Sequence, residues 1–307
     1  MDKVIAILHT ALPVFLVLGL GMLCRSRRFL TREGVDALKK VVLNITLPAV
    51  LLNAFSSTEY TLQTIALPVL MFLVCCLALA LGHLIIRISG MKSRLAPFLA
   101  SGFEAGMLGY ALFQLLFPGE STSRFAILDL GQTLFVFTLY KVLLSGKKDM
   151  KAIGKDMVTS PILWAVFVGV LLGATGLYRA MGRFRGILDS ATDFVSAPTG
   201  MIILLTVGYD LVLGDIPWKK TAGLIAMRLV VMAVCLGVVL GLNRWVLGDM
   251  IFPGAAVLMC LLPPPYVIPV FADEPAERVQ ISSALSALTL VTMVLFALYS
   301  VILGIQT

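Results

Sequence analysis

The chain has 307 residues, of which 59% are hydrophobic and 13% are charged, and its mean hydropathy is +1.00. This composition excludes an ordinary soluble domain, because apolar stretches of about 20 residues, long enough to cross ~30 Å of hydrocarbon, recur along the whole length. The net charge of +7 fits the asymmetry of basic residues that orients membrane proteins better than it fits nucleic-acid binding. We expect a multi-pass membrane protein.

The first apolar stretch, 4–24, is preceded by one lysine and followed by three arginines within four residues. This layout is the reverse of a signal peptide, and no A-x-A-like cleavage site accompanies it. We expect the stretch to be retained as the first membrane helix.

Ten stretches are candidate membrane spans. They cover 4–24, 38–55, 62–86, 95–117, 123–145, 157–178, 187–213, 221–243, 251–271 and 279–304. If the N-terminus faces outward, sixteen lysines and arginines fall on inner loops and six on outer ones. The positive-inside rule therefore places both termini outside.

Five spans precede the basic cytoplasmic linker 146–156 and five follow it, which predicts two halves, 1–145 and 157–307. Because five is odd, the second half enters the membrane from the opposite face, and a duplicated fold would be inverted. Pro48 in the second span is matched by Pro198 in the seventh. The predicted fold is an all-α membrane protein with two inverted five-helix repeats.

Two segments interrupt the apolar pattern near the middle of corresponding spans. The fourth span contains Gly102-Phe-Glu-Ala-Gly106-Met-Leu-Gly109, and the ninth contains Pro263, Pro264 and Pro265. Three successive prolines exclude a continuous helix, and broken backbone at membrane depth is tolerated only inside protein or beside a polar cavity. We expect the two breaks to cross at the midplane, where half-helix N-termini favour a bound anion.

Glu104 lies inside the fourth-span break, where an ionised carboxylate costs about 2.5–3.5 kcal/mol on insertion scales. We favour a proton- or cation-coupling role, because an ionised Glu104 would repel an anionic substrate. The alternative is a carboxylate that accepts hydrogen bonds from unpaired N–H groups at the helix break.

Other polar residues lie within predicted spans. Asp129 and Gln132 share a helix face, and we expect them to line a cavity, although Asp129 pairing with Lys141 or Arg124 is the alternative. For Arg228 we favour extension to the inner surface over a role as counter-charge to an anion. Two further patterns are interpreted mainly as helix packing: the stripe Ser283, Ser286, Thr289 and Thr292, and the glycine pairs 169/173 and 237/241. For the stripe, lining of the transport pathway is the alternative.

In order and spacing, these motifs resemble the auxin efflux carrier family, which includes plant PIN-type carriers and bacterial malonate or malate permease-like proteins. The resemblance runs nearly end to end. It rests on Leu12-Pro-Val-Phe15, Gly19-x-Gly21, Asn44-Ile-Thr-Leu-Pro-Ala-Val-Leu-Leu52, Gly106-Met-Leu-Gly109, Asp129-Leu-Gly-Gln132, Pro198 with Val207-Gly208, and Leu262-Pro263 with Ala272. It implies ten helices related to those of bile acid/sodium symporters, crossed broken fourth and ninth helices, and elevator-type alternating access.

The chain departs from the family pattern at two places. Glu104 stands where many members carry Asn, and Ala111 stands where many carry Pro. The added titratable group favours ion coupling and makes auxin a doubtful substrate.

We therefore predict a secondary transporter of a small organic anion in the bacterial inner membrane, with an uncoupled facilitator as the alternative. The expected substrate-binding residues are Glu104, Gly106, Asp129, Gln132, Asn44, Pro48, Pro263, Pro264 and Pro265, with Glu104 and Asp129 as ion-coupling residues and Asn44 and Asn53 flanking a break at Pro48. The expected partners are the anion, a proton or Na+, the lipid bilayer and, as one option, a second copy of the chain, but no nucleic acid.

No cofactor, metal or enzymatic activity is expected. The five cysteines lack CxxC spacing and the two histidines lie far apart. The sequence contains no Walker A, H-E-x-x-H or G-x-S-x-G pattern.

Overall fold

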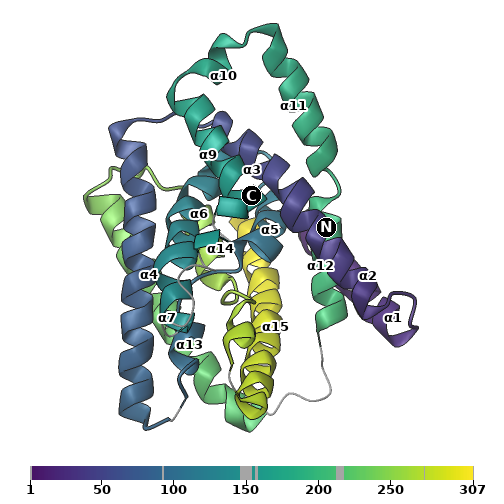
Figure 1. Ribbon diagram of the computed structural model, residues 1–307, viewed down its shortest axis with the longest axis vertical. Helices are drawn as coiled ribbons and strands as arrows, with labels where there is room; N and C mark the ends of the chain where they lie inside the picture. Colours follow the sequence, from purple (N-terminus) through teal and green to yellow (C-terminus); the bar gives the residue numbers. More distant parts are fainter. Residues whose placement is uncertain are drawn as a thin grey trace.

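A computed structural model describes residues 2–91, 93–145, 154–155, 158–211, 218–272 and 274–306. The secondary structure of these residues is helical, with no strand (Figure 1). The first half contains α1 (Asp2–Ser26), α2 (Arg32–Val41), η1 (Val42–Thr46), α3 (Leu47–Ser56), α4 (Leu62–Ser89), η2 (Ala96–Ala100), η3 (Ala105–Gly109), α5 (Tyr110–Leu116), α6 (Ser123–Phe135), η4 (Val136–Tyr140) and α7 (Lys141–Ser145).

The second half contains α9 (Pro161–Ala174), α10 (Leu177–Ala180), α11 (Arg183–Ser196), α12 (Thr199–Asp210), α13 (Trp218–Trp245), α14 (Pro253–Leu261), η5 (Ile268–Phe271) and α15 (Pro275–Gln306). Each of the ten predicted spans thus coincides with at least one helical segment. Of the basic linker 146–156, all but 154–155 lies outside the described residues.

Five of the described helical segments are long and apolar enough to cross a membrane. They are Thr64–Ser89, Ser123–Ser145, Arg183–Asp210, Thr221–Trp245 and Ala276–Leu303. The chain is therefore a multi-pass membrane protein by the length and composition of its helices.

Pro48 does not break its helix. The chain continues from α2 through the π-helical turn η1 into α3, in which Pro48 is the second residue. A proline removes one i→i−4 hydrogen bond, and the wider π turn that precedes it accommodates the altered bonding. The predicted break at Pro48 is wrong, whereas Pro198 does stand between α11 and α12.

Glycines bring α1 and α12 into direct backbone contact. A Cβ atom at Gly21 of α1 would lie 2.2 Å from the carbonyl oxygen of Leu205, and one at Gly208 of α12 would lie 2.2 Å from that of Leu18. Any larger residue at either position would force the two helices apart.

The same close packing joins α3 to α9. A Cβ atom at Gly169 would lie 2.8 Å from Cβ of Phe55, and one at Gly173 would lie 2.8 Å from the Phe55 carbonyl oxygen. The packing prediction for this glycine pair is confirmed. It is wrong for Gly237 and Gly241 of α13, where an added Cβ would meet no described atom within 4 Å.

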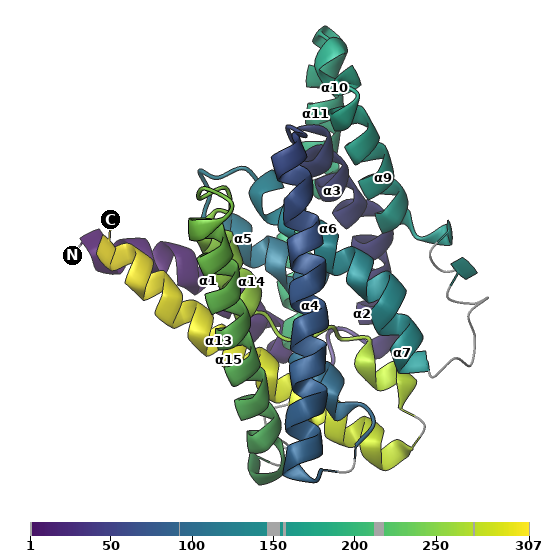
Figure 2. The same cartoon turned by 90° about the vertical axis from the view of Figure 1, so that its left-hand side faces the viewer.

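The helices α4 and α13, each of 28 residues, lie side by side and run in opposite directions (Figure 2). The ends of α1 and α15 that carry the two chain termini also lie close together (Figure 2). The short segments η2, η3, α5 and α14 pack among these long helices, and most of their residues are buried. The two interrupted spans are therefore held inside the bundle.

Candidate functional site

The two predicted breaks are present and they meet. Residues 101–104 separate η2 from η3, and residues 262–265 end α14, all without helical structure. The backbone N–H of Glu104 donates a hydrogen bond of 2.8 Å to the carbonyl oxygen of Pro263. One break therefore satisfies a backbone group of the other, as membrane depth requires.

The Glu104 carboxylate also joins the two breaks. Its Oε1 accepts from the backbone N–H of Met107 at 3.2 Å, which caps the N-terminus of η3, and its Oε2 accepts from the backbone N–H of Tyr266 at 2.7 Å. A carboxylate is suited to accept two N–H groups at once. These two hydrogen bonds support the interpretation of Glu104 as a carboxylate that caps unpaired N–H groups. They are compatible with a coupling role for the same residue.

Glycine and proline make the close approach of the breaks sterically feasible. Gly102 has a φ of +70°, and a Cβ atom there would lie 2.8 Å from Cγ of Pro265. A Cβ atom at Gly109 would lie 2.7 Å from Cδ1 of Leu262, and one at Gly106 would lie 3.2 Å from Cδ2 of Leu47. The neighbouring Pro264 is buried.

Asp129 and Gln132 form a buried hydrogen-bonded cluster beside the first break. Asp129 accepts from the Tyr110 hydroxyl at 2.9 Å and from Nε2 of Gln132 at 3.2 Å, and the same Nε2 donates to the carbonyl oxygen of Phe103 at 3.0 Å. Arg124 forms its ion pair with Glu120 instead. The proposed pairing of Asp129 with Arg124 is therefore wrong, and this cluster supports the backbone of the break.

Arg228 of α13 is 2% exposed and does not reach a surface. Its guanidinium donates to the carbonyl oxygens of Leu99, Gly102 and Leu262, at 3.3, 2.8 and 2.9 Å. The prediction that this side chain extends to the inner surface is wrong, because the carbonyl groups freed by the two breaks lie within its reach.

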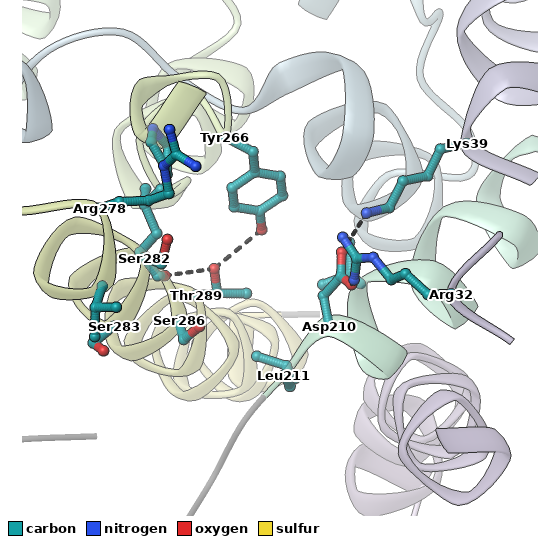
Figure 3. A pocket seen from close by; sticks show the side chains of 14 residues that line it. Arg32, Lys39, Asp210, Leu211, Tyr266, Arg278, Ser282, Ser283, Ser286 and Thr289 are labelled. Atoms are coloured by element: carbon teal, nitrogen blue, oxygen red, sulfur yellow. Dashed lines mark hydrogen bonds and ion pairs between the residues drawn. The ribbon is translucent and has the colours of Figure 1, made fainter. Parts of the chain in front are cut away.

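We call the contact between residues 101–104 and residues 262–265 the crossing. A cavity of about 590 Å³ opens next to it, with Tyr266 on its wall. Arg278 lies on one side of Tyr266, and Arg32, Lys39 and Asp210 lie on the other (Figure 3). Asp210, at the end of α12, forms ion pairs with both Arg32 and Lys39 of α2. The cavity thus has three cationic side chains and one carboxylate on its walls.

Small hydroxyl groups of α15 complete the cavity wall. Ser283, Ser286 and Thr289 line it, and the Tyr266 hydroxyl and Thr289 Oγ1 are 3.1 Å apart. Thr292, one turn beyond, donates instead to the carbonyl oxygen of Leu261 at the end of α14, at 2.7 Å. The polar stripe therefore both lines the cavity and holds the ninth-span break.

The family comparison concerns the half of the chain that carries the first break. The model of the membrane transport protein family matches residues 6–156, which include Glu104 and Asp129. The match assigns these residues to the membrane transport protein family. A comparison with curated proteins gives no match. The suspected relationship to auxin efflux carriers is confirmed, and the protein is a membrane transporter.

Two residues expected at the site of this membrane transport protein, and Asn53 beside them, lie elsewhere. Asn44 is exposed on η1, and Pro48 lines a separate, mainly apolar cavity of about 300 Å³. Asn53 donates to Oδ1 of Asp193 at 2.9 Å on the exposed surface. The structure therefore does not bring Asn44, Pro48 and Asn53 of the second span to the contact between the two breaks.

Sequence reasoning missed Tyr266, Asp210 and the grouping of the three basic residues in this transport protein. Tyr266 follows the triple proline directly, so its N–H and ring had to lie at the break. Asp210 and Arg278 lie near span ends, where charged residues are common and give no site signal.

Proposed function

We propose that this transporter carries a small organic anion, a carboxylate, through the crossing of its two broken spans. The cavity beside the crossing carries the proposal. Arg32, Lys39 and Arg278 outnumber Asp210 on its walls, so the field inside favours an anion. The proposed substrate site extends from these residues to Glu104, Gly106, Asp129, Gln132 and Pro263–Pro265.

The cavity size fits a small substrate. Its volume of about 590 Å³ lies within the range of small-molecule sites, and its serine, threonine and tyrosine hydroxyl groups can donate to carboxylate oxygens. The N-terminus of η3 and α5 at the crossing adds a positive dipole end.

Coupling to a proton is proposed to occur at Glu104. While ionised, its two oxygens accept from Met107 and Tyr266 and hold the two breaks together. Protonation converts one acceptor oxygen into a hydroxyl donor and removes negative charge near the substrate. Asp129, buried beside the same break, is the second candidate for this role.

The proposed architecture has ten membrane crossings, arranged as inverted repeats 1–145 and 157–307. In such an arrangement the first span corresponds to the sixth, and the seventh corresponds to the second. The first and seventh spans pack through glycines, as α1 on α12. Their counterparts, the sixth and second spans, also pack through glycines, as α9 on α3. The antiparallel α4 and α13 are corresponding third and eighth spans. Elevator-type movement of the crossing would expose it to each side in turn, with both termini outside the bacterial inner membrane and a homodimer as the proposed assembly.

The alternative is an uncoupled facilitator of organic anions with the same fold. Purified protein in liposomes distinguishes the two. A panel of labelled mono- and dicarboxylates is screened for uptake under an inward proton gradient and, separately, for counterflow without a gradient. Accumulation above equilibrium supports the coupled transporter. Counterflow without accumulation supports the facilitator, and the absence of both contradicts organic anion transport.

A further inference from the structure

The most unusual charge in the described residues is the guanidinium of Arg228. It is buried on an apolar helix, α13, and forms no ion pair with any carboxylate of the described chain. The ring of Phe103 lies 5.4 Å from Cζ, which provides a favourable cation–π contact. An isolated charge at such a position persists only where surrounding dipoles compensate it.

The compensating dipoles are carbonyl groups of both breaks. Leu99 belongs to the last turn of η2, Gly102 lies in the first break, and Leu262 is the residue that ends α14. Carbonyl oxygens at helix ends lack intrahelical partners and carry partial negative charge. The guanidinium therefore lies where the negative ends of two half-helices converge.

Such oxygen clusters are the places where transporters with broken helices bind coupling cations. Here three of these oxygens accept from one guanidinium, and Nε of Arg228 has no partner among the described residues. We infer that the guanidinium of Arg228 replaces a bound alkali-metal ion at the crossing. It compensates the partial negative charge of these carbonyl oxygens, so that the two breaks assemble without Na+. The consequence for ion coupling rests on the proposed function. If Arg228 takes the place of Na+, the proton is the ion that couples to anion transport.

Thermal unfolding of the purified full-length protein tests the inference without any transport assay. The melting temperature is measured in NaCl, KCl and choline chloride of equal ionic strength. The wild type is expected to melt at the same temperature in all three. Arg228→Ser leaves the carbonyl cluster without its cation, and we expect its Tm in choline chloride to fall by more than about 3 °C and to recover in part in NaCl.

Arg244→Ser is the matched control. Arg244 lies at the exposed end of the same helix and pairs with Asp249 at 2.6 Å, so its loss should change neither the Tm nor its response to salt by more than about 1 °C. If Arg228→Ser yields no folded protein, Arg228→Lys replaces it. Its ammonium group keeps the charge but has fewer donors, so we expect an intermediate Tm without a specific Na+ effect.

Three results with the wild type and Arg228→Ser would overturn the inference. They are a Na+-specific rise in the wild-type Tm, an Arg228→Ser protein as stable as the wild type, and an Arg228→Ser protein that is destabilised but does not respond to NaCl. A Na+-specific rise in Arg228→Lys has the same meaning. Failure of anion uptake would instead contradict the proposed function and leave these Tm results standing.

Discussion

The backbone N–H of Glu104 donates to the carbonyl oxygen of Pro263 across 2.8 Å, and this bond joins two spans that lie in opposite halves of the chain. The Glu104 carboxylate adds a second link through the N–H of Tyr266. Tyr266 in turn forms part of the wall of the basic cavity. We therefore expect a change in the protonation of Glu104 to act on Tyr266, which lines the proposed substrate cavity.

Glu104→Gln should weaken the crossing. The amide NH2 of glutamine cannot accept a hydrogen bond, so one of the N–H groups of Met107 and Tyr266 loses its partner. An unsatisfied buried donor costs about 1–3 kcal/mol, and we expect a lower Tm in detergent. Glu120→Gln is the control, since Glu120 pairs with Arg124 away from the crossing. Equal melting temperatures for both variants would argue against the bridging role.

Asp129→Asn separates the two candidates for coupling. The substitution disturbs the hydrogen bonds with Tyr110 and Gln132, and we expect a loss of stability of about 1–3 kcal/mol. The pH dependence of uptake should remain that of the wild type. If the dependence disappears in Asp129→Asn and persists in Glu104→Gln, Asp129 is the coupling residue and the assignment to Glu104 is wrong.

Gly102→Ala should disrupt the contact between the breaks. Gly102 has a φ of +70°, and the added Cβ would lie 2.8 Å from Pro265. A left-handed conformation costs a non-glycine residue about 1–2 kcal/mol, and the overlap adds to this. Uptake and Tm should both fall. Gly237→Ala, on an open face of α13, should leave uptake unchanged and preserve or slightly raise Tm, because alanine favours a helix by about 1 kcal/mol over glycine.

Asp210→Asn should tighten binding of an anionic substrate. Asp210 neutralises part of the charge of Arg32 and Lys39, so its removal makes the cavity more positive. These side chains are partly exposed, and we expect an effect within about 1 kcal/mol, or roughly a five-fold fall in KM for uptake. Asp249→Asn, which breaks an exposed ion pair with Arg244, is the control. A raised KM in Asp210→Asn would contradict anion binding in this cavity.

The positions of the breaks were predictable from sequence because backbone chemistry alone determines them. Three prolines cannot continue a helix, and the cluster of glycines around Glu104 permits a turn that other residues resist. The consequence of a single proline was not predictable. Pro48 removes one hydrogen bond, and whether the helix then breaks or widens into a π turn depends on its neighbours in space.

The partners of the charged residues depended on tertiary structure. In the sequence Arg228 lies near the end of its span, so its side chain was expected to reach water. In the folded chain it donates instead to the carbonyl oxygens of Gly102 and Leu262. Asp210 meets Arg32 and Lys39 only because α12 packs beside α2. No local pattern in the sequence encodes these distances.

Proton-coupled anion transport through Glu104 is tested by measuring proton and carboxylate entry together in proteoliposomes, at a series of external pH values, for the wild type and Glu104→Gln. The carboxylate is the one that gives the strongest uptake in the screen. In the wild type each carboxylate should enter with net proton uptake, and uptake should rise as external pH falls, because in the proposed mechanism Glu104 is protonated when it moves with an anion. In Glu104→Gln, uptake should no longer depend on pH and should proceed without net proton movement. Substrate-driven proton entry that persists unchanged in Glu104→Gln would contradict the central claim.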